Sequence, residues 1–184
     1  MADWCDWTEP GGYTFRLTAG DRGLRVIDLR PGPPPEDPPR ASHPILAETA
    51  RQLRAYFAGG LREFSLPLDL QGTQFQLRVW HALLRIPYGA TESYRNIAVS
   101  LGCSNAVRAV GAANGANPIP IIVPCHRVIG SSGKLVGYGG GLPLKKRLLE
   151  LERAAVTPQS ELFPQEIQSV TDNQKRVRVG SQLP

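Results

Sequence analysis

The sequence predicts an α+β protein made of a small N-terminal α/β domain with an antiparallel β-sheet and a mainly helical C-terminal domain with a helix-turn-helix. Three observations predict this fold class. Residues 14–29 alternate apolar and polar side chains around a glycine-containing turn, which is typical of a β-hairpin. Residues 45–57 and several later segments carry apolar side chains at helical spacing. Two short helical patterns are joined by Gly102-Cys103-Ser104, as in a helix-turn-helix.

The N-terminal domain is predicted to cover residues 1–70. Its hairpin pairs residues 14–18 with residues 24–29, and the proline-rich stretch from Pro31 to Pro39 forms a stiff exposed loop, since proline cannot donate to a β-ladder. A helix follows over residues 45–57 and ends at Gly59-Gly60. Residues 66–70 are predicted to form a short edge strand.

The C-terminal domain is predicted to cover residues 71–156 and to begin with a capped helix. Thr73 is the expected N-cap, and Gln76 is its reciprocal partner three residues later. The pattern stops at Pro87-Tyr88-Gly89, and the buried stripe of this helix comprises Phe75, Val79, Leu83 and Ile86.

Two helices and a terminal helix complete this domain. We expect Ser93 to cap a helix over residues 94–101, and Ser104 to cap a second one over residues 105–114. The last helix begins near Leu142-Pro143 and buries Leu144, Leu148, Leu151 and Ala155. Residues 157–184 are polar and lack periodicity, so we predict a disordered tail.

The stretch Pro124-Cys125-His126-Arg127 carries the most specific chemical signal in the chain. A thiol next to an imidazole and a guanidinium is a candidate nucleophile, because the thiolate is the reactive form and a nearby base or cation raises its population. The preceding apolar, proline-containing segment predicts a buried and rigidly held cysteine. An ordinary buried cysteine is the alternative, but the polar neighbours favour the reactive interpretation.

Charge and cysteine content indicate the setting in which this thiol works. The chain has 184 residues and a formal net charge of +5, and residues 93–144 contain no Asp or Glu. An acid-free stretch that carries the nucleophile favours a nucleic-acid partner over a plain solvated face. The three cysteines do not form a disulfide framework, and neither a signal peptide nor a long apolar run is present. We therefore expect a cytoplasmic protein without membrane contact.

A longer signature surrounds the cysteine, running from Asn117-Pro118 through Pro120 and Val123-Pro124-Cys125-His126-Arg127 to Ser132-Gly133 and Gly137–Leu142. It resembles the signature of the O6-alkylguanine-DNA alkyltransferases, also called methylated-DNA–protein-cysteine methyltransferases, and the resemblance extends over residues 14–153. This implies a ribonuclease H-like N-terminal domain and direct-reversal DNA repair. The alkyl group of O6-alkylguanine in double-stranded DNA would pass irreversibly and stoichiometrically to Cys125 after base flipping.

The resemblance also implies roles for residues around the nucleophile. His126 would accept the thiol proton through a water molecule, and Glu152 would hold His126. Asn117 would brace the turn that carries Cys125. The alternatives are a surface glutamate at position 152 and a plain Asn-Pro turn at position 117.

The expected DNA and substrate contacts rest on the same resemblance. Arg108 would enter the base stack and Tyr94 would push the backbone phosphate, while further DNA contacts would come from Ala109, Gly111, Asn114 and Ser131. In the substrate pocket, the Tyr138 hydroxyl would donate to the leaving guanine and the Val128 carbonyl would accept from its amine. Pro120 would wall the alkyl group, and Gly139 belongs to a pliable loop that lacks the serine of some relatives.

No cofactor and no metal are expected, because Cys5, Cys103, His43 and His81 do not suggest a tetrahedral site. We expect a monomer, with cooperative binding along DNA and activity on O4-alkylthymine left open. Three other functions remain as alternatives: a lesion sensor without transfer, a transcription regulator that uses the helix-turn-helix, and a cysteine hydrolase.

Overall fold

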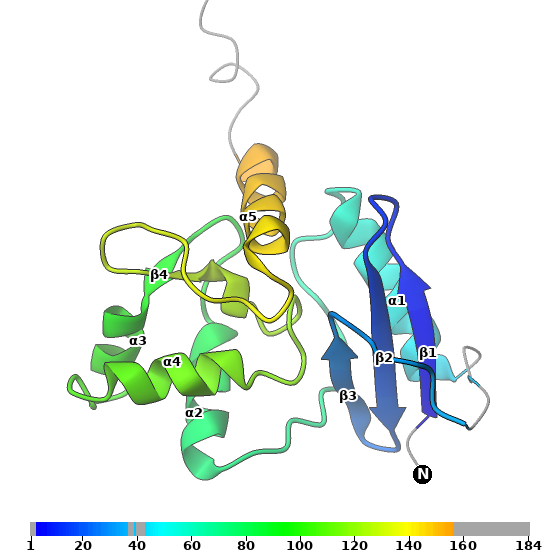
Figure 1. Cartoon of the computed structure of the whole chain (residues 1–184), viewed down its shortest axis with the longest axis horizontal. Helices are drawn as coiled ribbons and strands as arrows, with labels where there is room; N and C mark the ends of the chain where they lie inside the picture. The colour runs from blue at the N-terminus through cyan, green and yellow to red at the C-terminus, as the bar shows by residue number, and fades with distance from the viewer. Residues whose placement is uncertain (1–2, 37–38, 40–42, 157–184) are drawn as a thin grey trace, which may run out of the picture.

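The structure, a computed structural model, describes residues 3–36, 39 and 43–156 of the chain. Figure 1 shows a sheet covered by one long helix on one side of the molecule, a group of shorter helices on the other side, and the last helix above the junction. This is the predicted α+β arrangement of an antiparallel N-terminal sheet followed by helices. The predicted tail over residues 157–184 lies outside the described residues.

The N-terminal sheet contains one strand more than the predicted hairpin. Its strands are β1 (Asp3–Thr8), β2 (Thr14–Gly20) and β3 (Gly23–Asp28), which pair antiparallel in the order β1-β2-β3. The hairpin of β2 and β3 is therefore confirmed, with a register shift between Thr18 and Ala19. Strand β1 was not predicted, because acidic side chains interrupt its apolar pattern, although Trp4, Cys5 and Trp7 are buried.

Helix α1 (Pro44–Phe57) packs against this sheet and buries Leu46, Leu53 and Tyr56. It ends as predicted, with Gly59 in the left-handed region at φ 75°. The predicted edge strand over residues 66–70 is wrong. Only one parallel bridge, between Leu24 and Leu68, is formed there, because Pro67 has no N–H to extend a ladder.

The helices of the C-terminal half are α2 (Gln74–Leu83), α3 (Tyr94–Ser100) and α4 (Val107–Gly115). The capping box of Thr73 and Gln76 is present, and the Ser93 hydroxyl accepts from the Asn96 N–H. The start predicted for the third of these helices is wrong. Ala106 is its N-cap and Ser104 does not cap it, because a turn in which the Ala106 N–H donates to the Cys103 carbonyl precedes the helix.

The remaining elements surround the candidate nucleophile. A single turn of 3-10 helix, η1 (Cys125–Arg127), leads into β5 (Val128–Ile129), which pairs parallel with β4 (Glu92–Ser93). Helix α5 (Leu142–Val156) confirms the predicted last helix and buries Leu144 and Leu148. No helix in the described part of the chain combines the length and apolar character that a membrane crossing requires.

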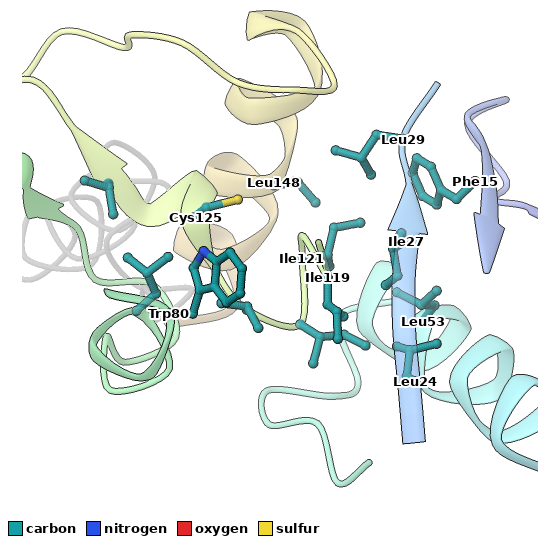
Figure 2. Packing of buried hydrophobic residues seen from close by; sticks show 14 of the residues in the cluster. Phe15, Leu24, Ile27, Leu29, Leu53, Trp80, Ile119, Ile121, Cys125 and Leu148 are labelled. Atoms are coloured by element: carbon teal, nitrogen blue, oxygen red, sulfur yellow. The ribbon is translucent and has the colours of Figure 1, made fainter. Parts of the chain in front are cut away.

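One hydrophobic core joins the two halves. In Figure 2, Ile119 and Ile121 lie between β3 and the segment that carries Cys125. The indole N–H of Trp80 donates to the Ala113 carbonyl at 2.8 Å and so ties α2 to α4. On the far side of the junction, the Arg147 guanidinium pairs with Glu9 at 2.9 Å, which joins α5 to the turn between β1 and β2. The site described below is therefore held from both domains.

Candidate active site

Cys125 lies at the start of η1, where it is only 4% exposed and packs in the shared core. The preceding turn is strained, because Ile121 has φ 75°, a region that a β-branched residue rarely adopts. Asn117 stabilises this turn: its Nδ2 donates to the Val123 carbonyl at 2.8 Å, and its Oδ1 accepts from the Ile119 N–H at 3.0 Å. The cysteine is thus placed by a rigid turn, and Asn117 does more than form an ordinary Asn-Pro turn.

The environment of Cys125 keeps its thiol protonated. Burial raises the pKa of the Cys125 thiol to about 11, although the Asn117 side chain and the Lys145 ammonium act in the opposite direction. At neutral pH the thiol form therefore predominates strongly over the thiolate. The neighbouring groups were predicted to raise the thiolate population in the resting protein, but the effect of burial on the thiol pKa is larger. For Cys125 to act as a nucleophile, a base would have to remove its proton.

His126 is the group with a free nitrogen for that task. It is fully buried, and its Nε2 lies 2.9 Å from Oε1 of Glu152. Because a carboxylate only accepts hydrogen bonds, Nε2 carries the hydrogen and Nδ1 is left as an acceptor. Nδ1 has no hydrogen-bond partner among the described residues. Burial lowers the pKa of His126, although Glu152 acts in the opposite direction. The lowered pKa keeps the imidazole neutral.

Glu152 is buried on α5 and accepts from four residues, not from His126 alone. The Arg127 guanidinium donates from Nε to Oε2 and from Nη2 to Oε1, both at 2.9 Å. The Tyr56 hydroxyl donates to Oε1 at 2.7 Å and the Gly89 N–H to Oε2 at 3.1 Å. Burial alone would raise the pKa of the Glu152 carboxyl, but the His126 and Arg127 contacts lower it to about 2. Glu152 is therefore no surface glutamate, and it is ionised.

Sequence reasoning missed the parts that Tyr56, Arg127 and Lys145 play here. Lys145 is completely buried, and its ammonium donates to the carbonyls of Val128 at 2.6 Å and Val136 at 2.8 Å. The sequence contained a signal for Lys145. It precedes Glu152 by seven residues, so the two side chains share one face of α5. For Tyr56 no local signal exists, because its partner lies 96 residues away.

A pocket of about 490 Å³ opens beside Cys125 and is lined from both domains. Its walls include β3 and the residues after it, the loop after Ser132, and α4. Within the described part of the chain, the buried Tyr138 hydroxyl and Asn114 Oδ1 have no hydrogen-bond partner, and both residues line this pocket. Seven of the predicted site residues other than Cys125 line it: Tyr94, Gly111, Asn114, Asn117, Pro120, Tyr138 and Gly139.

The other predicted contact residues lie elsewhere. Arg108 and Ala109 are exposed on α4, and Ser131 is exposed on the loop after β5. Val128 is fully buried and does not line the pocket, and its carbonyl already accepts from Lys145. The roles predicted for all these residues stay predictions.

Together, the fold and the site define a two-domain protein with a buried cysteine, the candidate nucleophile, at a pocket beside a helix-turn-helix. Family models carry the identification further. Residues 14–70 match the model described as the 6-O-methylguanine DNA methyltransferase ribonuclease-like domain, and residues 74–154 match the DNA binding domain of the same methyltransferases.

Individual relatives agree with both matches. The methylated-DNA–protein-cysteine methyltransferase of Mycobacterium bovis is 63% identical over 112 residues, which is 61% of this chain and 68% of the relative. That of Methanosarcina barkeri is 50% identical over 139 residues, covering 74% of this chain and 88% of the relative. The crystal structure of Mycobacterium tuberculosis OGT in complex with DNA superimposes with a TM-score of 0.73 at 49% identity, covering 84% of this chain and 93% of that one. The chain belongs to the 6-O-methylguanine DNA methyltransferase family.

Proposed function

We propose that this protein repairs DNA by direct reversal, moving the alkyl group of O6-alkylguanine in double-stranded DNA onto the sulfur of Cys125. The observation that carries the proposal is the pocket: Cys125 lines it together with two polar side chains, Tyr138 and Asn114, whose buried polar atoms lack partners within the described structure. A buried polar group without a partner is costly, and a bound purine edge would satisfy both. Membership of the family supports the same reaction.

The chemistry is an in-line displacement at the alkyl carbon. The sulfur–carbon bond forms as the carbon–O6 bond breaks, and the bonding electrons go to the purine. His126 Nδ1 takes the thiol proton through a water molecule, and the Glu152 carboxylate stabilises the imidazolium that results. The Tyr138 hydroxyl donates a hydrogen bond to the leaving purine. The His126 imidazolium then returns its proton through water, so that the base becomes neutral guanine and stays in the repaired strand.

The target base must leave the duplex, since O6 pairs inside the helix and the sulfur lies in a buried site. Helix α4 links the two requirements: Asn114 on one side of it lines the pocket, and Arg108 on another is exposed to a partner. Tyr94 packs beside Gly111 at the pocket wall, where it meets the rotating nucleotide. Arg108 fills the space that the base vacates.

Each molecule acts once, because a thioether is not reversed by water or by thiol exchange. The protein acts as a monomer, since one chain supplies the pocket, the nucleophile and the base. A free thiol of this kind suits the reducing cytoplasm.

Mass spectrometry of the product tests the proposal. The protein is incubated with excess duplex that contains one O6-methylguanine, and with the same duplex containing guanine. We expect a gain of one methyl group in place of one hydrogen on the peptide that contains Cys125, with the methylated duplex only. Unmodified Cys125 in folded protein that binds the duplex would overturn transfer and favour a lesion sensor. Continued release of repaired duplex beyond one equivalent would overturn the single use.

A further inference from the structure

A tyrosine hydroxyl of the N-terminal domain takes part in the hydrogen-bond network of Glu152 and His126, next to Cys125. Tyr56, on α1, is fully buried, and its hydroxyl lies 2.7 Å from Oε1 of Glu152 on α5. Glu152 is ionised and accepts only, so Tyr56 donates this bond. The same oxygen accepts from Nε2 of His126 at 2.9 Å, which places Tyr56 one atom away from the base.

The carboxylate is fully engaged by its surroundings. Tyr56, His126 and Arg127 all donate to Oε1, and Arg127 and the Gly89 N–H donate to Oε2. Such a set of donors holds the carboxylate in one orientation. Each donor also withdraws negative charge that would otherwise favour a proton on His126. The Tyr56 hydroxyl is the only one of the four donor residues that comes from the sheet domain.

We infer that Tyr56 is a positioning residue for alkyl transfer: its hydroxyl, supplied by the N-terminal domain, fixes the Glu152 carboxylate and so sets the orientation and basicity of His126. This inference rests on the proposed function. It assigns the N-terminal domain a direct part in the chemistry, in addition to its share of the pocket wall.

The groups that face His126 determine the direction of the effect. Glu152 and Lys145 approach from α5, Cys125 and Arg127 flank it in η1, and the Tyr138 ring lies edge-on with its centroid 6.5 Å away. Removal of the Tyr56 hydroxyl leaves this set unchanged but returns negative charge to Oε1. The protonated imidazole is then better stabilised, so the pKa of His126 rises and the neutral base is lost at a higher pH.

The chain offers a closely matched control in Tyr88. Its ring lies 6.0 Å from that of Tyr56, edge to face, in the same aromatic cluster. Its hydroxyl oxygen is also buried but has no hydrogen-bond partner among the residues the structure describes. Tyr56→Phe and Tyr88→Phe each delete one buried hydroxyl and keep the ring, so the two variants differ in whether that hydroxyl reaches the carboxylate.

The experiment measures single-turnover methylation of Cys125 from duplex containing O6-methylguanine, between pH 5 and pH 9, for the wild type and both variants. General bases contribute about 10²–10⁴-fold to rate, and Tyr56 acts on the base only indirectly, through Glu152, so we expect Tyr56→Phe to lose roughly tenfold. Its acid limb should move to higher pH, and the His126 imidazole nitrogen signals should titrate at higher pH in NMR spectra. Tyr88→Phe should match the wild type in transfer rate, in pH profile and in the titration of His126.

The possible outcomes separate this inference from the proposed function. If Tyr56→Phe keeps the wild-type pH profile and His126 titration, the inference is overturned, even if the rate or the unfolding temperature falls. If the wild type itself leaves Cys125 unmethylated, the proposed function fails. In that case the NMR titration still reports whether the Tyr56 hydroxyl controls the basicity of His126.

Discussion

The ammonium nitrogen of Lys145 lies 2.6 Å from the carbonyl oxygen of Val128, three residues after Cys125. The same nitrogen contacts the carbonyls of Val136 at 2.8 Å and Gly137 at 3.4 Å. The buried Lys145 ammonium therefore connects β5 to the loop that leads to Tyr138, and we call these contacts the Lys145 clamp. Burial lowers the pKa of Lys145 to about 8, against the opposing effect of Cys125, so this clamp titrates close to neutral pH.

Replacing Lys145 with methionine should slow alkyl transfer while DNA binding is retained. A hydrogen bond that involves a charged group contributes about 1.5–3 kcal/mol, so the loss in rate should be roughly tenfold or more. In the wild type, Lys145 loses its proton as pH rises through about 8, and the thiolate loses a favourable charge. The variant lacks this titration, so the rate deficit should narrow above pH 8.

Lys146→Met is the matched control for that experiment, since Lys146 is the exposed neighbour that pairs with Glu150 at 3.6 Å. Rates measured by mass spectrometry across pH 6–9 should show no change for this variant. A Lys145→Met variant with the wild-type rate and profile would exclude the role of the clamp in transfer.

Cys125→Ser and Cys125→Ala should both abolish transfer, because neither side chain offers a sulfur nucleophile. Affinity for duplex containing O6-methylguanine should stay near the wild-type value, since the thiol is buried and α4 is unchanged. Fluorescence anisotropy of labelled duplex and the mass of the protein after incubation check both statements. Demethylated guanine produced by the alanine variant would contradict the mechanism.

Arg108→Ala should slow repair of duplex DNA far more than transfer from the free base O6-methylguanine. Arg108 is exposed on α4, and its proposed task is to occupy the space left by the flipped nucleotide, a cost that the free base does not carry. Single-turnover rates with both substrates test the difference. Arg51→Ala removes an exposed charge on α1 and should alter neither rate. Equal losses on both substrates would remove the proposed role of Arg108.

Glu152→Gln should destabilise the folded protein by about 3–5 kcal/mol at pH 7, because Arg127 is left as an uncompensated buried charge. The pKa of Glu152 is lowered to about 2 in the folded state, below its usual 4.5, so its stabilisation is present above about pH 4.5. That stabilisation is lost as pH falls from about 4.5 towards 2. Urea unfolding at several pH values should show the difference between wild type and variant shrinking over that range.

The exposed Glu150 provides the comparison for this stability measurement. Glu150→Gln removes a carboxylate from the same helix, one that is exposed and pairs with the solvent-exposed Lys146, so its effect should be small. A deficit for Glu152→Gln that stays constant down to pH 2 would contradict the assignment of Glu152 as the titrating group.

The local sequence determined the elements that are stabilised by contacts between residues only a few positions apart. The capping box of Thr73 and Gln76 formed as predicted, because both partners lie within one helical turn. The Cys125-His126 pair was also recognisable from adjacent residues, whereas the bracing role of Asn117 was implied by the family resemblance. Local rules failed where the ends of a segment depend on neighbours in space: β1 is a strand because β2 pairs with it, and Ser104 lies in a turn outside α4.

Folding decided the contacts that cross the domains and the state of the site. Tyr56 and Glu152 are 96 residues apart, and no periodicity connects them; packing of α1 near α5 brings them to 2.7 Å. The adjacent cysteine and histidine predicted a reactive pair, but burial keeps the thiol protonated and the imidazole neutral. The chain alone specifies which chemical groups are available, whereas desolvation and long-range hydrogen bonds, which exist only in the packed molecule, set their protonation and orientation.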